Sequence, residues 1–183
     1  GMALFGFGMY GIAAWLSHNS PLALLSFCIA AAAASFLYFN FNPAKIFMGD
    51  SGSIPLGFLA AAMGLWGWQQ GSWMLWFPLL VFSPFIVDAS ITLLRRALRG
   101  ARVSEAHREH YYQRLVQIGW GHRNVALFAY AMMFAAGVSA LWGIHRPAGL
   151  PWLLFIAWGA LYTLLMLTLD IRWQAFRRGK LHG

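Results

Sequence analysis

Long runs of apolar residues dominate the chain, and short polar segments separate them. One helical crossing of a bilayer needs about 20 apolar residues, with roughly 17 to 25 as the working range. Because the runs do not alternate between apolar and polar positions, they favour helices over strands. The pattern predicts an all-α polytopic membrane protein. Its six spans are expected at about 2–16, 22–39, 54–68, 73–94, 125–144 and 151–169, the first and third being short.

The composition supports a lipid environment. Hydrophobic residues make up 60% of the chain and charged residues only 10%, whereas about a quarter of a soluble domain is charged. Lipid offers the backbone no hydrogen-bond partners, so a chain this apolar must span as helices or as a closed barrel. The single cysteine, Cys28, excludes a disulfide framework and a cysteine metal cluster.

The basic residues lie almost entirely on one side of the predicted bundle. Of the 13 Lys and Arg residues, only Arg146 falls in the other set of alternate loops. Cytoplasmic loops are enriched in Lys and Arg, which places both termini and the loops 40–53 and 95–124 in the cytoplasm. This topology accounts for the net charge of +8, so the basic composition does not predict nucleic-acid binding.

The first long polar segment, residues 40–53, combines glycines with helix-start residues. Gly49 and Gly52 can adopt positive φ and expose successive N–H groups as an anion nest. Ser53 is expected to cap the next helix, and Pro55 suits its first turn. The positive end of that helix would then face the cytoplasmic interface, where it can hold a phosphate.

Asp50 lies inside this segment and offers a hard oxygen ligand for Mg²⁺ bridging phosphate oxygens. The alternative is a capped helix start in which Asp50 only complements the helix dipole. A second alternative treats Ser51 as a nucleophile with a histidine of the next loop as its base. The segment alone leaves these alternatives open.

The second long polar segment, residues 95–124, joins a basic cluster to a predicted short helix at about 105–118. Positions three apart share a helix face, so His107 and His110 are expected to point the same way, with Arg114 one turn further. Two imidazoles and a guanidinium can bind phosphate oxygens, and one imidazole can transfer a proton. The alternative is an interfacial amphipathic helix on anionic lipid headgroups.

Two motifs together resemble the polyprenyl-phosphate N-acetylhexosamine-1-phosphate transferases. They read Asn-Pro-Ala-Lys-Ile-Phe-Met-Gly-Asp-Ser-Gly-Ser at 42–53 and His-Arg-Glu-His-Tyr-Tyr-Gln-Arg-Leu at 107–115. The resemblance implies transfer of a sugar 1-phosphate from a UDP-sugar to a polyprenyl phosphate such as undecaprenyl phosphate, with release of UMP. It also implies Mg²⁺ as cofactor, with Mn²⁺ as a substitute. The expected location is the cytoplasmic face of the bacterial inner membrane, in cell-envelope polysaccharide or peptidoglycan synthesis.

The resemblance also assigns roles to individual residues. Asp50 matches the metal ligand of the Gly-Asp motif, and His107 and His110 match the catalytic His-x-x-His pair. Asp88 lies where similar proteins often have an Asp before the basic loop; the alternative is a helix-end charge near Arg95. The residues expected to bind phosphate or substrate are Lys45, Gly49, Ser51, Gly52, Arg95, Arg96, Arg108 and Arg114.

One departure from the family bears on activity. The family's acidic Asp-Asp pair and its Asn-rich motif ending in Asp-Gly do not occur in these 183 residues. Residues 1–6 resemble the family's segment just after the second of these motifs, so residues 1–183 are expected to be the C-terminal part of one transferase domain, inactive alone. The rival functions are a non-enzymatic membrane scaffold or lipid-binding protein, and an intramembrane serine hydrolase using Ser51.

Overall fold

A computed structural model of the chain describes residues 1–100, 110–144, 146–147 and 149–181. The regular structure within these residues is helical, which confirms the predicted all-α class. The helices are α1 (Met2–Leu16), α2 (Ser20–Asn40), α3 (Gly49–Gln69), α4 (Trp76–Val81), α5 (Ser83–Leu98), α6 (Tyr111–Gln117), α7 (His122–Gly143) and α8 (Gly149–Leu181).

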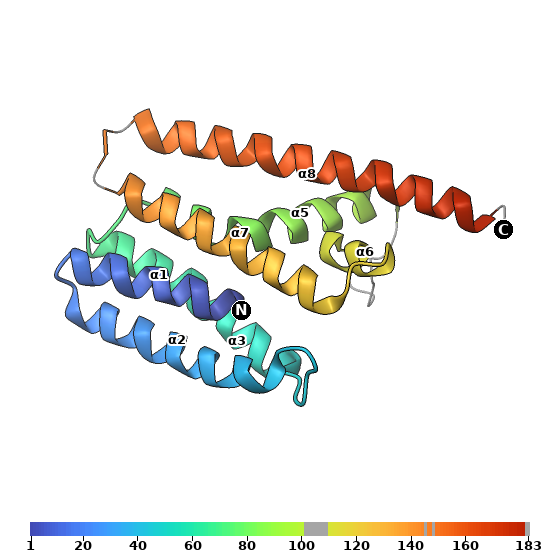
Figure 1. The fold of residues 1–183 in the computed structure, drawn as a ribbon. Helices are drawn as coiled ribbons and strands as arrows, with labels where there is room; N and C mark the ends of the chain where they lie inside the picture. The colour runs from blue at the N-terminus through green and yellow to red at the C-terminus, as the bar shows by residue number, and fades with distance from the viewer. Residues whose placement is uncertain (101–109, 145, 148, 182–183) are drawn as a thin grey trace.

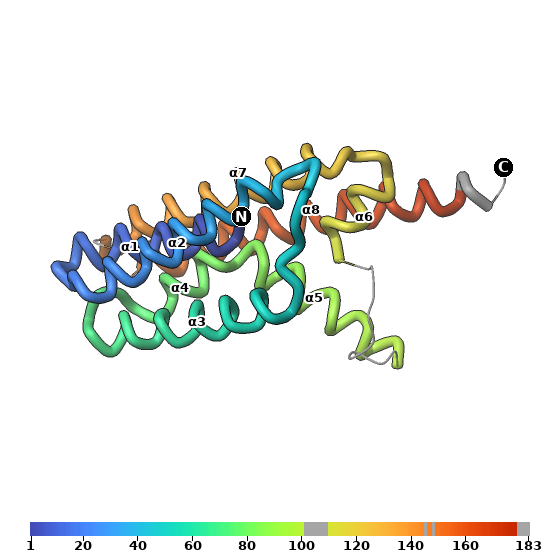
Figure 2. Tube along the Cα trace, turned by 90° about the horizontal axis from the view of Figure 1, so that it is seen from below, coloured from blue at the N-terminus to red at the C-terminus, as the bar shows by residue number. Residues whose placement is uncertain are grey.

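The long helices lie side by side as an elongated bundle (Figure 1). Helix α1 packs between α2 and α7, and α7 also contacts α4, α5, α6 and α8. One end of the bundle holds the α1–α2 turn and the α3–α4 connection. The 41–48 loop, α6 and the C-terminal ends of α5 and α8 lie toward the other end, as Figure 2 also shows. The described parts of the two polar segments predicted to share one side of the membrane therefore lie at the same end of the bundle.

Three of the described helices are long and apolar enough to cross a membrane: α2, α7 and residues 149–178 of α8. Helix α1 is apolar but shorter. Helix boundaries agree closely with the predicted spans at 2–16, 22–39 and 125–144. The count of six spans remains a prediction.

The predicted span at 73–94 is not one continuous helix, because the structure divides it into α4 and α5. Pro84 has no N–H to donate and its ring obstructs a continuous helix. The Ser83 hydroxyl donates to the Leu80 carbonyl oxygen at 2.7 Å. Its oxygen lies 2.6 Å from the Tyr162 hydroxyl, which therefore donates to Ser83 and ties the break to α8.

Small residues let α1 approach its neighbours closely. A Cβ atom added to Gly6 would lie 2.2 Å from the ring of Phe82, and one added to Gly137 would lie 2.6 Å from Met9. Tyr10 is fully buried beside these contacts, and its hydroxyl donates to the Ala60 carbonyl oxygen of α3 at 3.1 Å. Close packing through small residues is a common way for apolar helices to associate in lipid.

Helix α8 continues well beyond the predicted end of its span at residue 169. Apolar character falls after that position, but no proline interrupts residues 170–181, so the backbone can stay helical while its surroundings change. Helix α8 runs alongside α7 (Figure 1). A hydrogen bond joins the two helices, because the Trp158 indole N–H of α8 donates to Ser139 Oγ of α7 at 2.9 Å. The extension places Asp170 and Trp173 beside α6.

Candidate functional site

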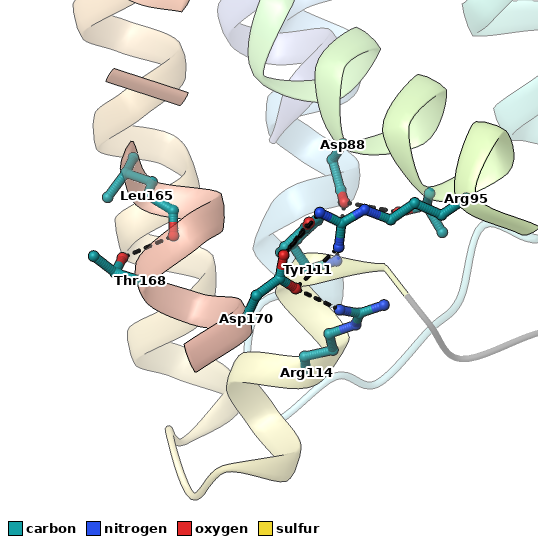
Figure 3. Close-up of polar contacts among 8 residues, drawn as sticks. Asp88, Arg95, Tyr111, Arg114, Leu165, Thr168 and Asp170 are labelled. Atoms are coloured by element: carbon teal, nitrogen blue, oxygen red, sulfur yellow. Dashed lines mark hydrogen bonds and ion pairs between the residues drawn. The ribbon is translucent and has the colours of Figure 1, made fainter. Parts of the chain in front are cut away.

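The carboxylate of Asp170 on α8 is the centre of a polar cluster at this end of the bundle (Figure 3). Arg95 of α5 donates to both of its oxygens, at 3.0 and 2.7 Å. Arg114 of α6 donates to Oδ1 at 2.9 Å, and the Tyr111 hydroxyl donates to Oδ2 at 3.2 Å. We call Arg95, Tyr111, Arg114 and Asp170 the Asp170 cluster.

The Asp170 cluster is positively charged and only partly shielded from solvent. Its two guanidinium groups and one carboxylate leave a formal charge of +1. The side chains are 33% exposed for Arg95, 9% for Arg114 and 20% for Asp170. The Tyr111 ring lies 5.3 Å from the Arg95 guanidinium carbon and 5.0 Å from that of Arg114, so cation–π contact adds to the ion pairs.

The ionisation of two members follows from these contacts. The hydrogen bond to Asp170 raises the pKa of Arg95 above its usual value, so its charge is retained. Burial, followed by the negative charge of Asp170, raises the pKa of Tyr111 to about 12. Tyr111 is therefore a neutral hydroxyl donor at physiological pH.

Asp88 of α5 forms a second polar group beside the Asp170 cluster. Its Oδ1 accepts the Tyr111 backbone N–H at 2.9 Å, and the Thr92 hydroxyl lies 3.4 Å from the same atom. Its Oδ2 lies 3.6 Å from His110 Nδ1. Asp88 thus holds the first N–H of α6 and faces a histidine, whereas Arg95 donates to Asp170.

The predicted helix at 105–118 is wrong at His110, since α6 begins only at Tyr111 and His110 is its non-helical N-cap. The Gln113 side chain accepts the His110 backbone N–H at 3.3 Å, which fixes this turn. His110 also stacks on Tyr112, with ring centroids 5.7 Å apart. The predicted partners His107 and Arg108 lie outside the described residues.

An apolar cavity of about 590 Å³ lies between α5, α6, α7 and α8. Asp88, His110 and Tyr111 line it together with aromatic and aliphatic side chains such as Phe128 and Met132. The cavity therefore joins a largely hydrocarbon wall to the polar groups at the start of α6. Such a surface suits a ligand with one charged end and one apolar end.

The segment around Asp50 differs from its prediction in where the helix starts. Helix α3 begins at Gly49, so Ser53 lies inside it and is not its cap. Gly49 has the expected positive φ of 62°, whereas Gly52 is an ordinary helical residue. The predicted nest of successive amides is therefore replaced by the first turn of α3, which carries Asp50, exposed, near the positive end of the helix.

Lys45 and Ser51 of this segment are also exposed. Lys45 lies in the 41–48 loop, which the Asn40 side chain closes by donating to the Ile46 carbonyl oxygen at 2.8 Å. Ser51 lies on the first turn of α3, and Pro55 lies within the helix rather than in its first turn. Ser51 lies on α3 and His110 at the start of α6, and the serine-nucleophile alternative stays a prediction.

The structure thus gathers the predicted residues into two groups at one end of the bundle. Asp88, Arg95, His110 and Arg114 lie around α5 and α6, whereas the Lys45–Gly52 group lies at the start of α3. Arg96 is buried, at 6% exposure, near the end of α5. Sequence reasoning missed Tyr111 and Asp170 as members of the site. One local signal pointed to Tyr111: it lies three residues before Arg114, and residues three apart share a helix face.

The described residues offer a divalent cation a single exposed carboxylate at α3. No group of three or more His, Cys, Asp or Glu side chains within the described residues is arranged to hold a metal ion. Mg²⁺ often takes only one or two protein carboxylates and completes its shell with water and substrate phosphates. Asp50 fits the role of one such ligand.

Known proteins match the chain along most of its length. Residues 1–67 match the model of glycosyl transferase family 4. "Probable undecaprenyl-phosphate N-acetylglucosaminyl 1-phosphate transferase" from Bacillus subtilis (strain 168) is 29% identical over 143 residues, covering 77% of this chain and 40% of that protein. "Phospho-N-acetylmuramoyl-pentapeptide-transferase" from Levilactobacillus brevis is 31% identical over 147 residues, covering 79% of this chain and 43% of that protein. No solved structure matches the chain.

Fold and composition define the chain as an all-α membrane protein. The chain is a homologue of these two transferases, and its residues 1–67 match glycosyl transferase family 4, in keeping with the resemblance of its two motifs. It spans less than half the length of the curated relatives it matches.

Proposed function

We propose that the protein, at full length, transfers a sugar 1-phosphate from a UDP-sugar to a polyprenyl phosphate and releases UMP. The proposal rests on one observation. This chain is a homologue of such transferases, and its Asp50 segment and its Asp170 cluster lie at the same end of the helical bundle. The proposed location is the cytoplasmic face of a bacterial inner membrane, and the proposed role is cell-envelope polysaccharide or peptidoglycan synthesis.

The arrangement suits phosphoryl transfer between two anions. Such a reaction needs charge neutralisation and in-line positioning more than covalent help. Arg95 and Arg114 supply positive charge at the end of the bundle, and the exposed Lys45 adds to it near α3. The apolar cavity beside His110 offers hydrocarbon surface next to these cations, which a lipid phosphate requires.

His110 is the proposed proton-transfer group. The Asp88 carboxylate faces its Nδ1 at 3.6 Å and so holds the ring from one side. A carboxylate beside an imidazole can orient the ring for proton transfer. His107 is proposed as the second member of the pair.

Asp50 is the proposed metal ligand. When bound there, Mg²⁺, or Mn²⁺ in its place, would supply further neutralisation of the diphosphate charge. The position of Asp50 on the first turn of α3 puts its carboxylate beside unpaired backbone N–H groups, which can contact phosphate oxygens.

The test is the full-length protein with Asp50→Asn, assayed for Mg²⁺-dependent UMP release from UDP-sugars in vesicles containing undecaprenyl phosphate. Arg172→Gln, an exposed change on α8, is the control and should retain activity. Near-normal UMP release by Asp50→Asn would refute the metal assignment. Salt-sensitive binding to anionic vesicles with no UMP release by any variant would instead support the scaffold alternative.

A further inference from the structure

Four donors from two helices converge on the single carboxylate of Asp170. They are two N–H groups of Arg95, one of Arg114 and the Tyr111 hydroxyl, at 2.7 to 3.2 Å. Together they fill the acceptor positions of both carboxylate oxygens. A phosphate group has the same kind of charged oxygens and one or two negative charges, so the same donors suit it equally well.

The charges favour exchange of the carboxylate for a phosphate. With Asp170 in place the cluster carries +1, and without it the two guanidinium groups would carry +2. A dianionic phosphate is attracted to both arginines but repelled by Asp170, so it binds better where the carboxylate has left. Because Arg95 is 33% exposed and Asp170 20% exposed, solvent reaches the place where this exchange would occur.

Helix α8 has a second attachment that would persist if Asp170 were displaced. Tyr162 hydrogen-bonds Ser83 at the α4–α5 break, two turns before Asp170, and Trp158 hydrogen-bonds Ser139 of α7. Loss of the Asp170 contacts would therefore loosen the C-terminal part of α8 from α5 and α6, while its N-terminal part stays packed. Trp173, whose ring lies 5.9 Å from the Arg114 guanidinium carbon, would move with it.

We propose that the Asp170 cluster is a phosphate-binding site in which the Asp170 carboxylate occupies the position of the phosphate. A phosphate or diphosphate group binds Arg95, Arg114 and Tyr111, displaces Asp170 and releases the end of α8. The choice of phosphate as the ligand rests on the proposed function. The group comes either from a soluble diphosphate or from a polyprenyl phosphate, and the experiment separates the two.

The experiment measures binding of the full-length protein, without metal or nucleotide sugar, to inorganic pyrophosphate in detergent and, separately, to vesicles with and without undecaprenyl phosphate. Asp170→Asn is expected to bind tighter by about tenfold, since a repelling charge is removed. Arg95→Gln is expected to weaken binding, and Asp170→Glu, which keeps the charge, should bind like the wild type. Arg172→Gln is the matched control on α8 and should leave the affinity unchanged.

Tightening for pyrophosphate identifies a diphosphate site, and tightening only for undecaprenyl phosphate vesicles identifies a lipid phosphate site. Unchanged or weaker binding of both ligands by Asp170→Asn overturns the proposal, because Asp170 would then have no effect on binding or would position the arginines.

Hydrogen exchange of the wild type provides a second test that needs no variant. The ligand must speed exchange in residues 166–176, and protection or no change there also overturns the proposal. Neither assay measures sugar-phosphate transfer. A negative result in these assays therefore does not bear on the proposed reaction, and loss of UMP release in a variant does not bear on the proposed phosphate site.

Discussion

Asp170 and Arg95 form a two-point ion pair, at 3.0 and 2.7 Å, between positions 75 residues apart in the chain. The pair fastens the end of α8 to the end of α5, beside the proposed reaction face. A bidentate guanidinium–carboxylate contact fixes the relative orientation of both side chains as well as their distance. The C-terminal part of α8 therefore contains a residue that contacts the site, although its basic residues Arg172, Arg177 and Arg178 alone indicate only membrane topology.

The histidine pair is predicted to be required for turnover. Replacing both His107 and His110 by Ala in the full-length protein removes the proposed proton-transfer groups and should lower turnover by about 10²- to 10⁴-fold. Membrane insertion should be retained, because neither residue lies in a predicted span. UMP release and membrane fractionation are the measurements. Unchanged turnover would show that the histidines serve the membrane interface instead.

Asp88 is predicted to hold the start of α6. Asp88→Ala removes the acceptor of the Tyr111 backbone N–H, and a lost cap of this kind costs about 1 kcal/mol. Amide exchange in α6 should therefore accelerate several-fold. Asp88→Asn keeps an acceptor oxygen and should preserve the protection of α6 while lowering activity through His110. Equal exchange in Asp88→Ala and the wild type would contradict the capping role.

Two glycines on α1 form a matched pair for testing helix packing. Gly6→Ala would place a Cβ 2.2 Å from the Phe82 ring and should destabilise the protein by about 1 to 3 kcal/mol. Gly8→Ala meets nothing within 4 Å and should be neutral or slightly stabilising, since Ala favours helix over Gly. Thermal unfolding in detergent measures both. A similar melting temperature for the two variants would show that α1 does not pack against Phe82 as described.

Stability at high pH is predicted to depend on Tyr111. Its pKa is raised from 10.0 to about 12 by burial and by the charge of Asp170, so the folded protein keeps a proton that the unfolded chain releases. This contribution is fully present below pH 10 and is lost as the pH rises through about 12. Melting temperatures of the wild type and Tyr111→Phe, taken from pH 9 to 12, should therefore converge as the pH rises. A constant difference would exclude this titration.

Much of the site could be predicted from local sequence. Glycine-flanked acids and clustered cations are rare in apolar chains, which singles out Asp50, His110, Arg95 and Arg114, and the structure brings three of the four around α5 and α6. The positive φ of Gly49 was also predicted correctly. The start of α3 was not, because a cap signal at Ser53 cannot show that the backbone is already helical four residues earlier.

The sequence by itself determined that this protein is all-α, embedded in lipid and basic at one end, because hydropathy and loop charge depend on residue type and local order. Only the tertiary structure decided that Asp170 meets Arg95 and Arg114, and that Asp88 holds the first turn of α6. These contacts join residues 23 to 75 positions apart, and helix packing rather than local pattern sets them. The carboxylate that completes the cationic cluster therefore became visible only once α8 was seen to continue past its span.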